Sequence, residues 1–120
     1  SKAVLVNIWA TWCRPCVEEF PDLVRLGKDF KARGLKIIFV SADFQSNLPA
    51  VQSFLHRQGV SEVSYLKVEP DEVFIGTLSE EWSGSIPATF LYDGSGQLRH
   101  FHEGKGNYTL FSQRVQEVLR

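Results

Sequence analysis

The 120-residue sequence lacks the features that define several large classes of protein. No apolar run approaches the roughly 18 residues of a membrane-spanning helix, and no charged segment followed by an apolar stretch and a cleavage site opens the chain. The 13 basic and 14 acidic residues are interspersed, so no basic stripe indicates nucleic-acid binding. Internal repeats and low-complexity segments are also missing. The length suits one domain with a single core, which should fold without a disulfide.

Cysteine is scarce as well, and the two copies stand close together in Trp12-Cys13-Arg14-Pro15-Cys16. An apolar run from Val4 to Trp9 precedes them, and a stretch with helical periodicity follows. A strand would therefore deliver both thiols to the first turn of a helix, where unpaired backbone N–H groups and the helix dipole favour anions. Because the thiolate is the reactive form of cysteine, this placement favours a redox dithiol.

Three residues apart on one helix, Cys13 and Cys16 lie on nearly the same face and can form a disulfide. Cys13, nearer the helix start, should be exposed and low in pKa, so we assign it as the nucleophile. Cys16, one turn deeper, would resolve the mixed disulfide with a partner. This exchange needs no cofactor.

Two other uses of the cysteine pair stay open. A zinc site would need further ligands, which the sequence offers only as His56, His100 and His102 at unknown distances, so no metal is expected. A purely structural disulfide would enclose too few residues to stabilise the fold much.

The apolar pattern predicts alternating strands and helices in the first half of the chain. Continuous apolar runs predict buried strands at Ala3–Trp9 and Leu35–Ser41. Between them, helical spacing predicts a helix over Arg14–Arg33 that bends at Pro21 and is ended by Gly34. Ligands of such sheets bind at the carboxyl ends of the strands, so the working edge should lie where the first strand meets the first helix.

In the second half, Ala88–Tyr92 and Gln97–His102 predict two antiparallel strands joined by the turn Asp93–Gly96. The other expected elements are a helix capped by Ser46 or Asn47 and ended by Gly59, a short strand near Tyr65–Val68, a helical turn near Asp71–Gly76, and a closing helix opened by Asn107 or Tyr108. Together these elements predict an α/β fold in one domain, a mixed β-sheet flanked by helices on both faces.

The segment from Val4 to Pro21 closely resembles the thioredoxin superfamily, specifically its TlpA/ResA-like branch of extracytoplasmic thiol-disulfide oxidoreductases. The segment from Ser85 to Gly96 resembles a second hallmark of that branch. The resemblance implies a thioredoxin-like domain over residues 1–120, with most of the family's N-terminal strand region missing. Because a central strand starts so close to Ser1, we expect a domain excised from a longer precursor that carries an N-terminal signal or membrane anchor.

The resemblance also implies roles for residues around the cysteines. Pro87 should follow a cis peptide bond and face the cysteine pair, with the backbone of Ile86 pairing with a substrate strand. Trp12 should pack beside the disulfide and shape the partner groove, whereas Trp9 is expected in the core. Whether Arg14 stabilises or destabilises the Cys13 thiolate is not predicted.

A glutamate three residues after the second cysteine is implied to matter in this branch, and that position is Glu19 here. Glu19 and Cys16 are i and i+3 neighbours, so the carboxylate could take the proton from the resolving thiol. Asn7, which cannot carry a proton, stands where typical cytosolic thioredoxins look to have a buried aspartate beneath the cysteines. The alternative is a solvated surface glutamate, for which Glu18 serves as a comparison.

The leading function is thus a thiol-disulfide oxidoreductase in the periplasm or on the outer face of the membrane, acting as a reductant, a direction implied by the resemblance alone. Its expected partners are protein disulfides or dithiols and an upstream thiol-disulfide donor, and the expected state is a monomer. One alternative is a thiol peroxidase, although peroxidases resembling this fold usually have threonine three residues before the reactive cysteine, whereas Thr11 stands two before Cys13. The other is a redox-coupled interaction module of a larger protein.

Overall fold

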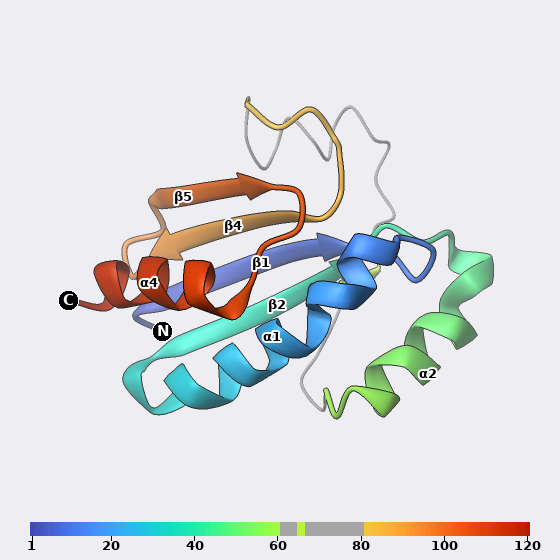
Figure 1. The fold of residues 1–120 in the computed structure, drawn as a ribbon, viewed down its shortest axis with the longest axis horizontal. Coiled ribbons are helices and arrows are strands. Elements are labelled where there is room, and N and C mark those ends of the chain that lie inside the picture. Colours follow the sequence, from blue (N-terminus) through green and yellow to red (C-terminus); the bar gives the residue numbers. More distant parts are fainter. Residues whose placement is uncertain (61–64, 67–80) are drawn as a thin grey trace.

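The computed structural model describes residues 1–60, 65–66 and 81–120. Within them, five strands form one mixed sheet in the order β3-β2-β1-β4-β5 (Figure 1). The elements are β1 (Ala3–Trp9), α1 (Arg14–Phe30), a 3₁₀ turn (Lys31–Arg33), β2 (Leu35–Ser41), a second 3₁₀ turn (Gln45–Asn47), α2 (Leu48–Arg57), β3 (Tyr65–Leu66), β4 (Ala88–Asp93), β5 (Leu98–Glu103) and α4 (Tyr108–Leu119). β1, β2 and β3 run parallel, whereas β4 is antiparallel to both β1 and β5. The expected α/β fold with a mixed sheet is confirmed.

β1 is the central strand, hydrogen-bonded to β2 on one edge and to β4 on the other. Its bounds and those of β2 agree with the prediction, because continuous apolar runs suit strands that are covered on both faces. Alternate side chains of β1 enter two separate clusters, with Leu5 and Trp9 in the larger and Ile8 in the smaller. Asn7 therefore points to the same face as Leu5 and Trp9.

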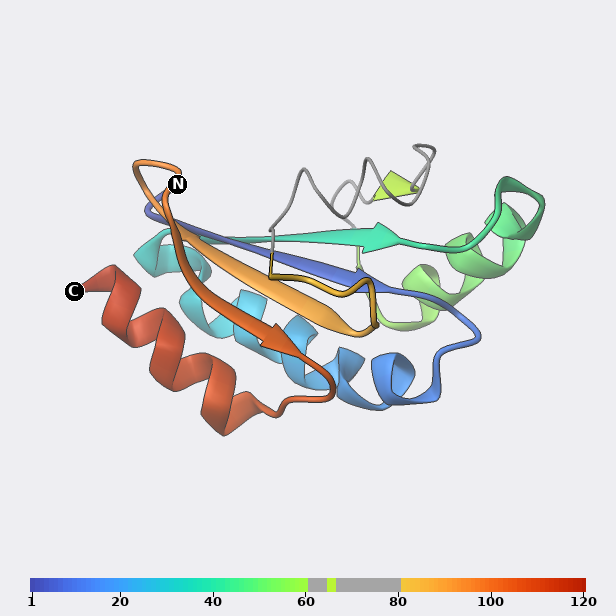
Figure 2. The same ribbon diagram turned by 90° about the horizontal axis from the view of Figure 1, so that it is seen from above.

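The larger cluster lies under the helices. α1 and α4 cover one face of the sheet (Figure 2), and α2 adds Val51 and Phe54 to the same cluster. On the other face, Trp82 packs with Ile8 and Phe90. The helical turn expected near residues 71–76 falls outside the described residues, so helices on both faces stay a prediction. None of the described helices is long and apolar enough to cross a membrane.

Helix ends follow the expected residues with two exceptions. Gly34 ends the first helical segment in the left-handed conformation, at φ 102°, and Asn107 caps α4 by accepting a hydrogen bond from the backbone N–H of Leu110 at 2.9 Å. α1 itself stops at Phe30, before the 3₁₀ turn, so it is shorter than expected. Asn47 stands at the N-cap position of α2, but its side chain makes no capping bond.

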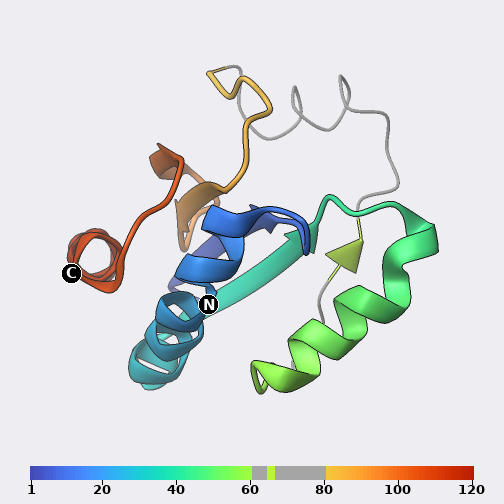
Figure 3. The ribbon, with the colours of Figure 1, turned by 45° about the vertical axis from the view of Figure 1, so that its right-hand side comes forward.

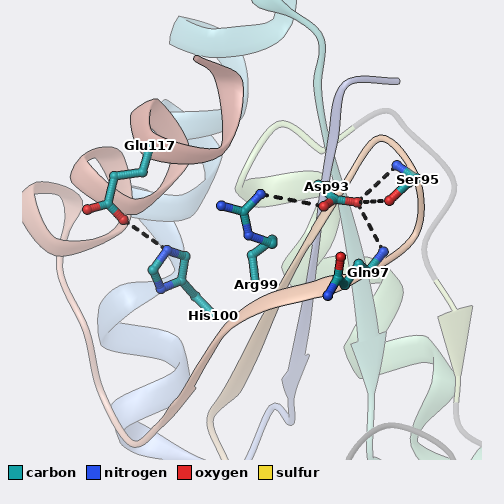
Figure 4. Close-up of polar contacts among 6 residues, drawn as sticks. All are labelled: Asp93, Ser95, Gln97, Arg99, His100 and Glu117. Atoms are coloured by element: carbon teal, nitrogen blue, oxygen red, sulfur yellow. Dashed lines mark hydrogen bonds and ion pairs between the residues drawn. The ribbon is translucent and has the colours of Figure 1, made fainter.

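The β4–β5 hairpin is confirmed. Its turn lies at the end of the sheet where β1 begins, since Ala3 pairs with Asp93. Figure 4 shows the turn: Asp93 Oδ1 accepts hydrogen bonds from the backbone N–H groups of Ser95 (2.9 Å) and Gln97 (3.1 Å). Its other carboxylate oxygen lies 3.5 Å from Arg99. These contacts fix the turn because aspartate accepts hydrogen bonds from the backbone that follows it.

An aromatic group in the larger cluster joins the sheet to two helices. The Phe20 ring of α1 lies 5.0 Å from that of Trp9, 4.3 Å from that of Phe39 and 4.9 Å from that of Phe54, between ring centroids. Phe20 is fully buried. It therefore connects β1, β2, α1 and α2 around one side chain.

Replacing Phe20 with alanine should lower the free energy of unfolding by roughly 3–5 kcal/mol, because the cavity would open between three aromatic rings. Urea unfolding followed by tryptophan fluorescence measures this loss. Phe44→Ala is the matched control: Phe44 is 83% exposed, so its replacement should change stability by no more than about 0.5 kcal/mol. Equal losses in the two variants would contradict this account of the core.

Candidate active site

The two cysteines form a disulfide at the start of α1. β1 ends at Trp9, a short turn follows, and α1 begins at Arg14 with Cys13 as its N-cap residue. Cys13 Sγ accepts a hydrogen bond from the backbone N–H of Cys16 at 3.3 Å. The two Cα atoms lie 5.3 Å apart, within the range that a disulfide accepts. The predicted position of both sulfurs in the first helical turn is confirmed.

The two cysteines differ in exposure less than expected. Cys16 is fully buried, and Cys13 is only 6% exposed. The expectation of an exposed Cys13 is therefore wrong for the disulfide form, although Cys13 remains the more accessible of the two. The reason is geometric: its sulfur is bonded to Cys16 and caps the helix, so the side chain folds back over the first turn.

Glu19 lies one turn beyond Cys16 and is buried, with 1% of its surface exposed. The alternative of a solvated surface glutamate is therefore wrong. Burial raises the pKa of Glu19 to about 7, although hydrogen bonds from the Gly106 backbone and the Asn7 side chain act to lower it. Glu18, its neighbour, is instead solvated and lies 3.5 Å from Arg14 and 3.3 Å from Lys105.

The Glu19 carboxylate is held from two sides. Asn7 Nδ2 donates to Glu19 Oε2 at 3.1 Å and also to Thr89 Oγ1 of β4 at 3.1 Å. The backbone N–H of Gly106 donates to Glu19 Oε1 at 2.9 Å. A Cβ atom at Gly106 would lie within 3.0 Å of three ring carbons of Phe111, so this approach of the backbone requires glycine.

The Ile86–Pro87 peptide bond is cis, as expected. Pro87 is buried, and its carbonyl accepts a hydrogen bond from the backbone N–H of Gly104 at 2.8 Å. β4 starts at the next residue, Ala88, which pairs with Ile8 near the carboxyl end of β1. The register therefore places Pro87 at the same edge of the sheet as the cysteine turn.

The aromatic and basic residues around the cysteines have distinct environments. Trp9 is fully buried, as expected of a core residue, whereas Trp12 is 66% exposed. The Arg14 side chain is 89% exposed and lies 3.5 Å from Glu18, one turn along the helix. Arg14 thus forms a surface ion pair, and such pairs contribute little to stability.

A second buried carboxylate, Asp43, was missed by the sequence analysis. It accepts hydrogen bonds from the backbone N–H (3.0 Å) and hydroxyl (2.6 Å) of Thr11. Ser41 Oγ donates to it at 2.6 Å and Asn47 Nδ2 at 2.7 Å. The one available signal was position: polar residues directly after a buried strand, at the edge of the sheet that carries the cysteines.

Burial acts to raise the pKa of Asp43, but the hydrogen bonds from Ser41, Thr11 and Asn47 outweigh it and hold the pKa below its usual value. Asp43 therefore stays ionised at neutral pH. We call Asp43 and its donors Thr11, Ser41 and Asn47 the Asp43 network. It ties the turn before Cys13 to the loop that follows β2.

Two of the three histidines considered as zinc ligands, His100 and His102, have other contacts. His100 Nε2 lies 3.0 Å from a carboxylate oxygen of Glu117 in α4 (Figure 4). His102 Nε2 lies 3.3 Å from the backbone carbonyl of Lys105. Within the part of the chain that the structure describes, no group of three or more potential ligands is placed to hold a metal ion.

The sheet order, the disulfide at the start of α1 and the cis-proline at the start of β4 define the thioredoxin-like class. A solved thiol:disulfide interchange protein of the thioredoxin family from Chlorobium tepidum TLS superposes with a TM-score of 0.84 at 30% identity, covering 99% of this chain and 81% of that one. The model of the AhpC/TSA family matches residues 1–101. The chain belongs to this family, and the resemblance to the thioredoxin superfamily is confirmed.

The curated relatives are named thiol-disulfide proteins. ResA from Bacillus subtilis (strain 168), a "thiol-disulfide oxidoreductase", is 32% identical over 98 residues, which are 82% of this chain and 51% of its own. HelX from Rhodobacter capsulatus, a "thiol:disulfide interchange protein", is 33% identical over 120 residues, 99% of this chain and 62% of its own. The chain thus spans about half to three fifths of the length of these relatives, and the ResA-like resemblance is confirmed.

The raised pKa of Glu19 predicts a pH-dependent stability. Glu19 binds its proton more tightly in the folded than in the unfolded state. The contribution of this proton to the free energy of unfolding is therefore full below about pH 4.5 and is lost as pH rises through about 7. Relative to Glu19→Gln, the wild type should lose about 3 kcal/mol of unfolding free energy over this range. Urea unfolding at several pH values measures the difference, with Glu18→Gln as the control. A wild-type curve parallel to that of Glu19→Gln would contradict the raised pKa.

Replacing Asp43 with alanine should lower the free energy of unfolding by about 3 kcal/mol, because several buried donors would lose their acceptor. Amide hydrogen exchange should also speed up at Thr11, whose N–H loses its partner. Glu18→Ala, which removes an exposed carboxylate that makes surface ion pairs on α1, serves as the comparison. Unchanged exchange at Thr11 would show that the network does not hold the turn.

Proposed function

We propose that this domain is a thiol-disulfide oxidoreductase that exchanges disulfides with extracytoplasmic proteins through Cys13 and Cys16, acting as a reductant. The observation that carries the proposal is the disulfide at the N-terminus of α1 with a buried carboxylate, Glu19, one turn further on. The names of the relatives support the reaction class. Location outside the cytoplasm and the direction of electron flow rest on the ResA-like resemblance.

The reaction begins from the dithiol form. The Cys13 thiolate attacks one sulfur of a partner disulfide, which forms a Cys13–partner disulfide and releases the partner's other sulfur as a thiolate. The N-terminus of α1 stabilises the Cys13 thiolate, because the helix dipole and the free backbone N–H groups favour negative charge there. Cys13, the more accessible sulfur, is the one that the partner meets first.

The second step releases the partner. Cys16 gives its proton to the Glu19 carboxylate, and its thiolate attacks Cys13, which forms the Cys13–Cys16 disulfide and frees the partner's second sulfur. Two electrons pass from the domain to the partner. An upstream dithiol donor then reduces the disulfide and returns the domain to its starting state. A pKa near 7 suits Glu19 for this role, because it can both accept and give up a proton at neutral pH.

The substrate-binding residues are part of the same proposal. The backbone of Ile86, directly before the cis-proline, would pair with an extended partner segment, and Trp12 would border it. We also propose that the domain acts as a monomer and that its full-length protein carries a membrane anchor. Both rest on the resemblance.

The peroxidase alternative is less well supported. The Thr11 hydroxyl donates to Asp43 at 2.6 Å and accepts from Asn47 at 2.9 Å, so it is engaged away from the cysteines. A peroxide-consumption assay with the reduced domain distinguishes the two functions. Faster turnover of peroxide than of protein disulfides would favour the peroxidase.

Cys13→Ser should abolish insulin reduction and the rearrangement of scrambled disulfides, because no nucleophile would remain at the helix start. Cys16→Ser should accumulate mixed disulfides, visible on non-reducing gels, because the resolving thiol would be missing. If wild type and Cys13→Ser behave alike in these assays, the domain is not an enzyme and the interaction-module alternative is favoured.

Glu19→Gln should slow release of the partner by roughly 100-fold, because the Cys16 thiol would lose its proton acceptor. The lifetime of the mixed disulfide in single-turnover experiments measures this step. Glu18→Gln is the matched control, since Glu18 is solvated and should leave the lifetime unchanged. Equal lifetimes in wild type and Glu19→Gln would remove Glu19 from the mechanism.

A further inference from the structure

The side chain of Glu103 holds the loop that leads into the cis-proline. Glu103 ends β5 and pairs with Ala88, the first residue of β4, so it stands beside the start of that strand. Its Oε1 accepts a hydrogen bond from the backbone N–H of Ser83 at 2.8 Å and one from the Ser83 hydroxyl at 3.2 Å. Figure 3 shows residues 81–87, drawn in gold, descending to the start of β4. A carboxylate at the end of one strand therefore fixes the loop before the neighbouring strand.

Ile86 is anchored through the residues on either side of it. The indole N–H of Trp82, which is buried in the smaller apolar cluster, donates to the backbone carbonyl of Ser85 at 2.8 Å. The backbone N–H of Gly104 donates to the carbonyl of Pro87 at 2.8 Å. Within the described part of the chain, no hydrogen bond uses the backbone of Ile86. The neighbours of Ile86 are thus fixed, and its own N–H and C=O stay available for a partner backbone.

The contact between Glu103 and Ser83 lies on the surface, where both residues are exposed. Surface polar contacts add little to stability, because water competes for the same groups. The buried Trp82 already ties the loop to the sheet, so the contact of Glu103 adds orientation rather than attachment. A carboxylate is a strong acceptor for a backbone N–H. A loop held in this way loses less conformational freedom when a partner binds.

We propose that Glu103 is a positioning residue for the partner: through Ser83 it holds the backbone of Ile86 in the orientation that pairs with an extended partner segment. The inference rests on the proposed function and deepens it. Pairing with Ile86 places the partner disulfide for attack by Cys13, and small errors in such placement slow a reaction strongly. Glu103 takes no part in bond making or proton transfer. It therefore affects the step that forms the mixed disulfide and not the release of the partner.

Two disulfides test this role: a peptide with one internal disulfide, and bis(2-hydroxyethyl) disulfide, which has no peptide backbone to pair with Ile86. The reduced domain is mixed with each, and tryptophan fluorescence gives the second-order rate constant for its oxidation. Glu103→Ala should lower the rate constant for the peptide about tenfold, because the backbone pairing would be lost. The rate constant for bis(2-hydroxyethyl) disulfide should be unchanged. Equal slowing with both disulfides, or no slowing with the peptide, would overturn the positioning role.

A second peptide checks that the effect passes through backbone pairing. The amide nitrogens next to its reacting cysteine carry methyl groups, so they cannot donate to a neighbouring strand. The wild type should be oxidised about tenfold more slowly by this peptide than by the unmethylated one, and Glu103→Ala should show little further loss. If the two losses multiply, or if methylation leaves the wild-type rate constant unchanged, Glu103 does not act through this pairing and the proposal is wrong.

Two variants separate position from charge. Glu103→Gln removes the charge but keeps an oxygen that can accept from Ser83, so it should retain about half or more of the wild-type rate constant with the peptide. A loss as large as that of Glu103→Ala would assign the effect to charge and overturn the proposal. Glu117→Ala is the matched control, because it removes an exposed carboxylate of α4 that lies 3.0 Å from His100. It should change none of these rate constants.

The outcomes also separate this inference from the proposed function. A wild type that reduces the peptide no faster than Glu103→Ala would overturn the positioning role and leave the oxidoreductase in place. A wild type that reduces neither disulfide would overturn the proposed function and the inference with it. Circular dichroism spectra and urea midpoints equal to those of the wild type show that the Glu103 variants are folded.

Discussion

The position of the candidate active site depends on β1, which is hydrogen-bonded to β2 on one side and to β4 on the other. β2 and β4 fix the register of β1 from both edges, so that Asn7 stands beside Thr89 and on the face that α1 covers. The helix that follows the same strand then brings Glu19 to Asn7. Because the side chains of a strand alternate between faces, a shift by one residue would turn Asn7 away from α1 and leave Glu19 without this partner.

Two buried carboxylates at the cysteine edge differ in what surrounds them. Asp43 and Glu19 are each only 1% exposed. Asp43 accepts from two side-chain hydroxyls, an amide and a backbone N–H, whereas Glu19 accepts from one amide and one backbone N–H. Desolvation acts more strongly on Glu19, which lies deeper in the protein, and its two donors do not offset it, whereas the larger set of donors keeps Asp43 charged. Depth of burial and donor number together separate a structural carboxylate from one that can exchange a proton near neutral pH.

The sequence predicted the elements that depend on local pattern. The apolar runs gave both bounds of β1 and of β2, and the glycine- and aspartate-rich turn gave the β4–β5 hairpin. Glu19 could be selected from its spacing to Cys16. Its buried environment could not be predicted, because Gly106, which donates a hydrogen bond to it, lies 87 residues away in the sequence. The Asp43 network joins positions separated by up to 36 residues and needs the sheet to form first. The accessibility of Cys13 was misjudged because helix spacing does not show how the disulfide folds its side chain back.

The approach of Gly106 to Glu19 has a consequence for how this protein can vary. The donor is a backbone N–H, so no ordinary change of side chain deletes it, yet any side chain at this position would strike Phe111 and move the donor. The proton affinity of Glu19 therefore depends on Gly106, a residue that has no side-chain functional group. A search for reactive side chains would pass over Gly106. A single substitution there would nevertheless alter the acid–base chemistry of Glu19, which lies 87 residues away in the sequence.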